Sequence, residues 1–450
     1  MFATISRFRS QAAVTLLLAA TALTACTQKE VILPGERLDV RAPLSEGSVP
    51  VEGYEPGTPA NRTAAVALPT ARSADWSHRA GTPDHLPGNA ALPASLTPVW
   101  SANIGQGNDR KHRIAADPVV SGGVIYTLDA QSRVTATATN GGTLWSADVT
   151  RGVDRAAEAS GGGLAVAAGR VYVTSGAAEL VALDARSGAI VWRQQLGTTA
   201  GGAPTAAAGK VFVASRDGTG WGIDAGTGKV DWTVPGLGRA GIMGASSPAS
   251  DGQIVVFPFP SGQLVAAEAG SGKILWKANV AGKRVGESYT SINDVTGDPV
   301  LAGNTVYAGT AAGRIAAIDK TTGQVIWAVG QGAASPPAVA GGAVFIVTDQ
   351  GKLMRLDAAS GGTVWAVDLP WFQPYRKERK RGPIFASFGP TLAGGRLVVA
   401  SGDGMVRSYD PASGTLVAET PLKGGAAAAP AVSGGVLYAV TKNGQLTALR

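Results

Sequence analysis

The stretch Ala317-Ile-Asp-Lys-Thr-Thr-Gly-Gln-Val-Ile-Trp327 decides the fold of this chain. It has the form of a strand end, a glycine turn and a short apolar strand that closes on tryptophan. Close copies end at Trp192 and Trp232, and looser copies end at Trp145, Trp276 and Trp365. Self-similarity at a period of roughly 40–50 residues is typical of a propeller or a solenoid, in which each repeat packs on its neighbours.

A second motif alternates with the first. It places an aromatic residue or valine eight positions after a proline, as in Pro118 and Tyr126. The same spacing recurs in Pro204 and Phe212, Pro248 and Val256, Pro299 and Tyr307, Pro337 and Phe345, Pro390 and Val398, and Pro430 and Tyr438. Leu164 and Tyr172 form an eighth copy without the proline. Two motifs in alternation indicate one repeated structural unit.

Each unit divides into four short runs of β-branched and aromatic residues. In the unit that starts at Asp298, turns at Gly303-Asn304, Ala312-Gly313 and Thr322-Gly323 separate these runs. Such spacing indicates antiparallel strands, and four-stranded units arranged in a ring form a propeller. We therefore predict an all-β fold, an eight-bladed β-propeller of four-stranded antiparallel blades.

The number of blades follows from the tryptophans that end the repeats. Six of them close six blades, and Ala418 stands at the equivalent position of a seventh. The last unit reaches Arg450 after only three strands, so we expect the segment Pro98-Val-Trp100 to supply its fourth strand and close the ring. We expect all of these indole rings to pack between blades rather than to bind a ligand: Trp100, Trp145, Trp192, Trp232, Trp276, Trp327 and Trp365.

The N-terminal region has a different composition. Residues 1–25 are predicted to be a lipoprotein signal peptide, because Arg7 and Arg9 precede an apolar run that is short for a membrane span. Leu23-Thr-Ala-Cys26 resembles a bacterial lipobox, which makes Cys26 the expected lipidation site; the alternative is an ordinary secretory signal. Cys26 is the only cysteine, so no disulfide can form within the chain. Residues 26–95 are predicted to be a lipidated proline-rich tether, and residues 96–450 the propeller.

The charge of the chain and its content of catalytic and metal-binding motifs limit the classes of function that the sequence supports. The net charge is +7, but the predicted secretion and lipidation argue against nucleic acid as a partner. The basic run Arg376 to Arg381 is either a solvated loop or a contact for anionic headgroups or an acidic partner. No catalytic motif, metal-binding pattern or cofactor site is identified. Acids at one repeated position are expected to cap turns: Asp184, Asp224, Asp319, Asp357 and Asp410.

The repeat Ala-x-Asp-x-x-Thr-Gly-x-x-x-Trp resembles the propellers of the pyrroloquinoline-quinone (PQQ) type. One group of these, the quinoprotein dehydrogenases, holds PQQ and Ca²⁺ on the ring axis, often under a vicinal cysteine pair that this chain cannot make. The other group is the BamB family of outer-membrane assembly lipoproteins, which the lipobox, tether and eight units resemble. That resemblance implies a non-enzymatic scaffold without a cofactor. It also implies a lipid anchor in the outer membrane, facing the periplasm, and Thr27 after the cysteine favours this location.

In that family, two loops leading into adjacent blades bind the POTRA repeats of BamA, within the complex (BAM) that inserts nascent β-barrel proteins into the outer membrane. The first loop matches residues 241–248, where Ile242 and Met243 replace a Leu-Arg pair. The second matches residues 291–299, where Asp294 keeps the first of two acids and Thr296 replaces the other. The alternative for both loops is that they are ordinary turns leading into a blade. For the whole protein, the alternative functions are a membrane-tethered PQQ-dependent dehydrogenase and a generic adaptor for cell-envelope assembly.

Overall fold

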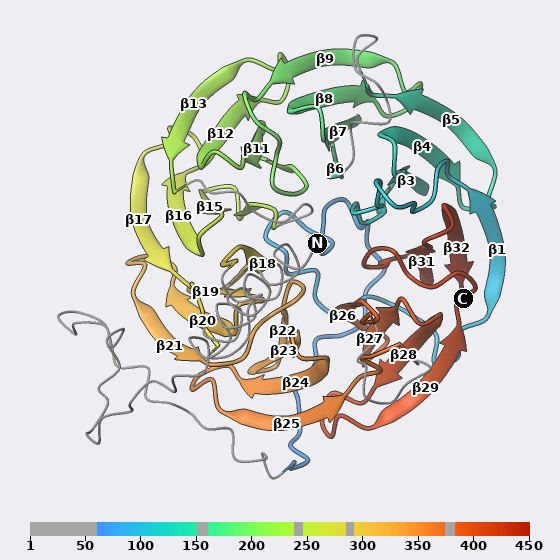
Figure 1. The fold of residues 1–450 in the computed structure, drawn as a ribbon, viewed down its shortest axis with the longest axis vertical. Coiled ribbons are helices and arrows are strands. Elements are labelled where there is room, and N and C mark those ends of the chain that lie inside the picture. Colours follow the sequence, from blue (N-terminus) through green and yellow to red (C-terminus); the bar gives the residue numbers. More distant parts are fainter. Residues whose placement is uncertain (1–60, 151–160, 238–245, 285–291, 374–382) are drawn as a thin grey trace, which may run out of the picture. The chain divides into compact units, whose positions relative to one another are not determined.

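The structure is a computed structural model, and it describes residues 61–150, 161–237, 246–284, 292–373 and 383–450. These residues contain strands and turns but no helix. Eight sheets of four antiparallel strands stand around a ring in chain order, as Figure 1 shows. The predicted eight-bladed β-propeller is therefore confirmed. None of the described residues forms a helix that is long and apolar enough to cross a membrane.

Each blade contains four strands, numbered here from the ring centre to the rim. The first strands are β2 (Val119–Ser121), β6 (Gly162–Ala167), β10 (Thr205–Ala207), β14 (Ala249–Ser250), β18 (Val295–Ala302), β22 (Ala338–Ala340), β26 (Ser387–Ala393) and β30 (Ala431–Ser433). The second strands are β3 (Val124–Leu128), β7 (Arg170–Ser175), β11 (Lys210–Ala214), β15 (Ile254–Pro258), β19 (Thr305–Thr310), β23 (Ala343–Val347), β27 (Arg396–Ser401) and β31 (Val436–Val440).

The outer half of each blade follows the same order. The third strands are β4 (Arg133–Ala138), β8 (Glu179–Asp184), β12 (Thr219–Asp224), β16 (Gln263–Glu268), β20 (Arg314–Asp319), β24 (Lys352–Asp357), β28 (Met405–Tyr409) and β32 (Gln445–Leu449). The fourth strands are β5 (Thr143–Asp148), β9 (Ile190–Gln195), β13 (Val230–Pro235), β17 (Ile274–Asn279), β21 (Val325–Val329), β25 (Thr363–Asp368), β29 (Leu416–Pro421) and β1 (Pro98–Asn103). We number the blades 1 to 8, from β2–β5 to β30–β32 with β1.

The ring closes where β1 pairs with β32, so the N-terminal strand completes blade 8 as predicted. Trp100 lies opposite Ala448 in this antiparallel pair. The pairing continues past the strand ends, where the backbones of Thr97 and Arg450 exchange two hydrogen bonds of 2.8 and 2.9 Å. Closure removes the long unpaired edge that an open array of blades would expose.

The two sequence motifs meet inside each blade. The residue that follows the proline pairs across the first hairpin with the aromatic side chain, as Val119 does with Tyr126. That aromatic ring then packs against the tryptophan of its own blade, with Tyr126 and Trp145 ring centres 5.9 Å apart. The motifs alternate in the sequence because they form one aromatic pair in each of blades 1, 2, 3, 5, 6 and 8. Valine replaces the aromatic residue in blades 4 and 7, at Val256 and Val398.

The tryptophans also join neighbouring blades, as predicted. Each indole N–H donates a hydrogen bond to a backbone carbonyl in the third turn of the next blade, as Trp276 does to Lys320 at 2.7 Å. The turn glycine lies beneath the ring: a β-carbon on Gly323 would stand 2.6 Å from Trp276. Gly323 also has a φ of +75°, a conformation that favours glycine. The Thr-Gly of one repeat is therefore the docking surface for the tryptophan of the preceding repeat.

This contact explains why Ala418 replaces tryptophan in blade 7. The next blade is blade 8, whose fourth strand is β1, so no turn connects its third strand to its fourth. An indole at position 418 would have no turn glycine on which to pack. The repeated acids cap the same turns, as predicted: the Asp319 carboxylate accepts hydrogen bonds from the backbone N–H and hydroxyl of Thr322. These bonds lower the pKa of Asp319.

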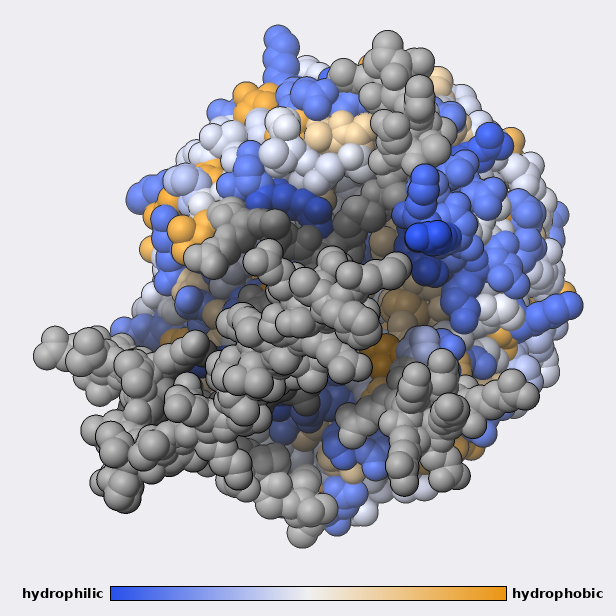
Figure 2. All heavy atoms as spheres, viewed as in Figure 1, coloured by the Kyte–Doolittle hydropathy of each residue, from blue (hydrophilic) through white to orange (hydrophobic). Residues whose placement is uncertain are grey.

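Apolar side chains on the fourth strands stay exposed around the rim, for example Leu144 and Ile326 at 55% and 53%. Figure 2 shows apolar side chains as scattered spots among hydrophilic ones. Blade 6 differs, because Val364 on β25 is buried. Residues near the start of the described chain cover it: the Arg62 N–H donates to the Val364 carbonyl at 3.2 Å, and Asn61 bonds the backbone of Ala366.

Residues 61–97, here called the strap, form hydrogen bonds with the ring from Asn61 at one end to Thr97 at the other. The strap starts at the rim of blade 6, crosses to the ring centre and leads into β1 (Figure 1). At the ring centre, Trp76 bonds Val120 of the first strand of blade 1. It makes polar backbone or side-chain contacts with all eight blades. The described part of the predicted tether is thus extended and packed on the propeller.

Candidate functional site

Two loops that connect neighbouring blades carry the predicted partner-binding residues. One leads from β13 into blade 4, and the other leads from β17 into blade 5. Their described parts touch, because the hydroxyl of Ser246 donates to the carbonyl of Val295 at 2.5 Å. The N–H of Ser247 donates to the carboxylate of Asp298 at 3.1 Å. The structure therefore brings the ends of the two loops together.

The predicted residues occupy different environments. Asp294 is buried, with 3% of its surface exposed, and lines a small hollow together with Arg216 and Phe259. Thr296 donates its hydroxyl hydrogen to the carbonyl of Ala333 in the segment that leads into blade 6. Ile242 and Met243 lie outside the described residues. The basic run 376–381 and Cys26 lie outside them as well.

Two exposed aliphatic side chains were missed by the sequence analysis. Leu237 is 56% exposed and Ile292 is 42% exposed, one in each loop. The signal was a single large apolar residue among turn formers, as in Gly236-Leu237-Gly238. Exposed apolar residues of this kind can supply the desolvated contacts of a protein interface. Asp294 is buried and could reach such an interface only if its loop rearranged.

The ring centre holds a group of three charges that the sequence analysis also missed: Asp298 is fully buried, while Arg79 and Asp117 are largely shielded. Arg79 of the strap forms an ion pair with Asp298 of blade 5 at 2.9 Å, and its Nε lies 3.8 Å from the carboxylate of Asp117 in the segment leading into blade 1. Blades 1 and 5 are on opposite sides of the ring (Figure 1). Burial raises the pKa of Asp298 to about 6, although Arg79 opposes the shift. Burial also raises the pKa of Asp117.

Two strap histidines are held neutral. His78 Nε2 accepts a hydrogen bond from the N–H of Ala206 at 3.0 Å, which requires its lone pair. His85 Nδ1 lies 2.8 Å from the carbonyl oxygen of Pro299 and donates to it. Burial lowers the pKa of His78 to about 3 and that of His85 to about 4. Within the parts of the chain that the structure describes, no cluster of three or more His, Cys, Asp or Glu side chains could hold a metal ion.

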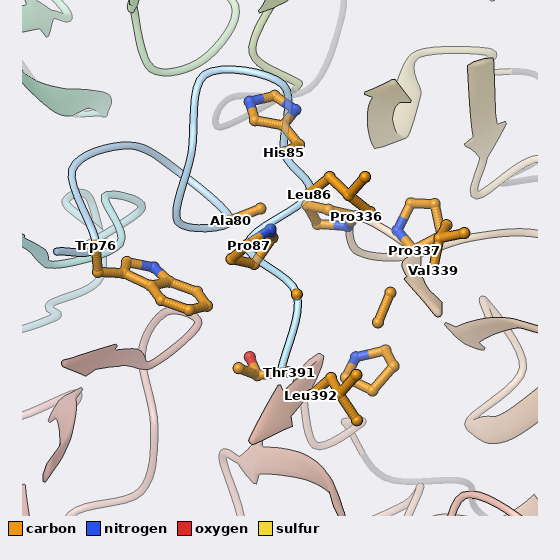
Figure 3. A pocket seen from close by; sticks show the side chains of 13 residues that line it. Trp76, Ala80, His85, Leu86, Pro87, Pro336, Pro337, Val339, Thr391 and Leu392 are labelled. Carbon is orange, nitrogen blue, oxygen red and sulfur yellow. The ribbon is translucent and has the colours of Figure 1, made fainter. Parts of the chain in front are cut away.

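A narrow crevice remains between the strap and the first strands of blades 6 and 7. Figure 3 shows Trp76, His85 and Pro87 on the strap side. The side chains of Val339 and Leu392 belong to the facing blades. The lining is mainly apolar, so the crevice can accommodate a small apolar group but offers few polar contacts for orienting it.

Comparison with known proteins places this geometry in a family. The sequence model of the family described as outer membrane protein assembly factor BamB matches residues 130–367 and 357–450. This chain belongs to the BamB family. The matched residues include all seven turns that accept the hydrogen bonds of the blade-joining tryptophans.

Relatives within the BamB family are of moderate similarity. BamB of Legionella pneumophila is 26% identical over 205 residues, which are 46% of this chain and 50% of the relative. BamB of Salmonella typhimurium is 34% identical over 215 residues, which are 47% of this chain and 55% of the relative. The chain thus matches about half the length of these curated relatives.

Solved structures show the same fold. BamB from Moraxella catarrhalis superimposes with a TM-score of 0.63 at 20% identity, over 79% of this chain and 98% of the other. The quinohemoprotein alcohol dehydrogenase from Comamonas testosteroni gives a TM-score of 0.64 at 18% identity, over 84% and 81%. At this level of identity the two likenesses establish the propeller architecture, which binding proteins and enzymes share.

Proposed function

We propose that this protein is a non-enzymatic scaffold lipoprotein of the outer-membrane β-barrel assembly (BAM) complex. Its membership of the BamB family is the observation that carries the proposal. In this role it binds the POTRA repeats of BamA and assists the insertion of nascent β-barrel proteins. Acylation of Cys26 anchors it to the outer membrane, facing the periplasm.

The partner surface is formed by the loops that lead into blades 4 and 5. Contact between Ser246 and Val295 holds the described loop ends in one place. Leu237 and Ile292 present exposed apolar side chains, one in each loop. Ile242 and Met243 belong to the loop of Leu237. A few apolar residues at the centre of an interface usually contribute most of the binding energy. Asp294 and Thr296 support the loop rather than contact the partner in this arrangement.

Pull-down of BamA from detergent extracts tests this surface. Ile292→Arg is expected to reduce BamA recovery at least tenfold, because it places a charge in a desolvated contact. Ile326→Arg is the matched control, since Ile326 is 53% exposed on the outer strand of blade 5, away from the loops. Ile242→Arg, tested alongside, extends the map to the loop that leads into blade 4. Equal recovery with Ile292→Arg and Ile326→Arg would contradict the assigned surface.

The rival hypothesis, a PQQ-dependent dehydrogenase, is tested on the same preparation. PQQ and Ca²⁺ are added, and dye reduction and a quinone absorption band are measured. We expect neither. The strap supports this expectation, because it places Arg79 and the buried ring of His85 at the ring centre. Dye reduction that depends on PQQ would overturn the scaffold proposal.

A further inference from the structure

The first strands of the blades present a circle of equivalent backbone donors to the ring centre. In five blades, the N–H at the same register position donates to the strap. These donors are Val120, Val166, Ala206, Ser250 and Leu301. A first strand is a sheet edge, and its inward N–H groups have no partner within the blade. The ring therefore offers an array of donors that an extended chain can satisfy.

The strap supplies the matching acceptors. Its carbonyl groups at Trp76, Ser77, Pro83 and Asp84 accept four of these bonds at 2.7–3.0 Å, and His78 Nε2 accepts the fifth. Proline is suited to this position because it carries a carbonyl but no N–H that would need a buried partner. The proline-rich composition that suggested a tether thus also fits a chain bound to a ring of donors.

The ring also holds a preformed acceptor for one cation. Asp298 accepts the N–H of Ser247, and Asp117 accepts the N–H of Ala429 at 2.8 Å, so neighbouring blades orient both carboxylates. Arg79 lies between them. Asp298 is fully buried, and its Oδ1 makes no hydrogen bond within the described residues, so Arg79 is its main counter-charge. Residues of the ring build the acceptor, while the strap delivers the cation.

We propose that the ring centre is a binding site for an extended peptide that carries an arginine, and that the strap is its resident ligand. The ligand class follows from the chemistry of the site: carbonyl groups for the circle of N–H donors, and one guanidinium for the carboxylates of Asp117 and Asp298. Trp76 anchors the peptide, since it exchanges two backbone hydrogen bonds with Val120 and is 4% exposed.

Chemical rescue of a full-length variant tests this site. Arg79→Ala removes the guanidinium and leaves the buried carboxylate of Asp298 and the largely shielded carboxylate of Asp117 without it, so we expect the unfolding equilibrium constant to rise about 100-fold or more. Millimolar ethylguanidinium has the chemistry of the missing group and is expected to lower the unfolding equilibrium constant of the variant at least tenfold. Ethylammonium at the same concentration is expected to reverse much less, because an ammonium is more strongly hydrated than a guanidinium and loses more on entering a buried site.

Arg396→Ala is the matched control. Arg396 also holds the strap, through the carbonyl groups of Pro93 and Ala94, and no carboxylate among the described residues pairs with it. Its loss is expected to be insensitive to ethylguanidinium. Equal rescue of both variants, or equal rescue by ethylammonium, would overturn the proposal. So would Arg79→Ala with unchanged stability, or a folded variant that ethylguanidinium does not restore.

If Arg79→Ala does not fold, Arg79→Lys keeps the charge but replaces the guanidinium with an ammonium. Hydrogen exchange is then measured at the amides of Val120, Val166, Ser250 and Leu301, which the strap protects. We expect exchange at these four amides to accelerate at least tenfold, while the amide of Ile318, inside blade 5, stays protected. Unchanged exchange at the four amides would overturn the proposal.

Discussion

The indole nitrogen of Trp100 lies 2.7 Å from the carbonyl oxygen of Thr139 and donates a hydrogen bond to it. Trp100 belongs to β1 in blade 8, and Thr139 to the third turn of blade 1. The same contact joins the other tryptophan-bearing blades to their successors, for example Trp145 to Ala185 at 3.0 Å. The N-terminal strand therefore contributes both the backbone pairing that completes blade 8 and the side chain that joins blade 8 to blade 1.

Trp100→Ala should weaken ring closure. We expect the free energy of unfolding to fall by about 3 kcal/mol, the lower end for loss of a large aromatic side chain, because Trp100 is only partly buried. Urea denaturation measures the change. Val99→Ala on the same strand is the control, since Val99 is 59% exposed and should change stability by less than about 0.5 kcal/mol. Equal losses would show that the indole contributes little.

Gly323→Ala and Gly209→Ala separate backbone strain from close packing. Both glycines have a φ of +75°, so alanine should cost about 1 kcal/mol at either position. A β-carbon at Gly209 would meet no atom within 4 Å, whereas at Gly323 it would meet Trp276. We expect Gly323→Ala to lose about 1–3 kcal/mol more in urea denaturation. Similar losses would exclude a role for the indole contact.

Acid should destabilise the fold through His78 and His85. Their pKa values are lowered in the folded state, so they stay neutral there, and their contribution is present above pH 6.5 and lost as the pH falls. At pH 5 the loss is about 2 kcal/mol for each histidine. The pKa of Asp298 is raised to about 6, which has the opposite sign and offsets part of the loss.

His78→Gln isolates one of these contributions. The glutamine amide can still accept the N–H of Ala206, but it does not titrate. Between pH 7.5 and 5 the variant should therefore lose about 2 kcal/mol less unfolding free energy than the wild-type protein. Denaturant titrations at a series of pH values measure both curves. Parallel curves would contradict the assignment of a buried, neutral His78.

Cys26→Ser should release the protein from membranes, since each buried CH₂ of an acyl chain contributes about 0.8 kcal/mol to anchoring. Fractionation of cells measures the distribution. Thr27→Asp is the matched variant: it keeps the cysteine, so we expect the protein to stay in membrane fractions but to move to the inner membrane. Cys26→Ser that still sediments with membranes would contradict lipid anchoring.

Short-range patterns predicted the blades well. The spacing of eight residues between Pro118 and Tyr126 predicts a hairpin, which the structure confirms. The spacing of Asp319 and Thr322 predicts a local turn cap, which the structure also confirms. The sequence places Ala418 at the tryptophan position but does not show the reason, because the cause lies in the connectivity of another blade. Exposed Ile292 and buried Asp294 could not be distinguished, since neighbouring loops rather than local sequence set their exposure.

By itself, the sequence determined the strand order, the blade count and the closing role of Trp100, because these depend on turn chemistry and on contacts that repeat with a fixed period. Only the tertiary structure decided the path of residues 61–97. That segment has no periodicity, and its partners are backbone N–H groups such as those of Val120 and Leu301, which every sequence carries. Arg79 meets Asp117 and Asp298 only because the ring brings opposite blades to a common centre.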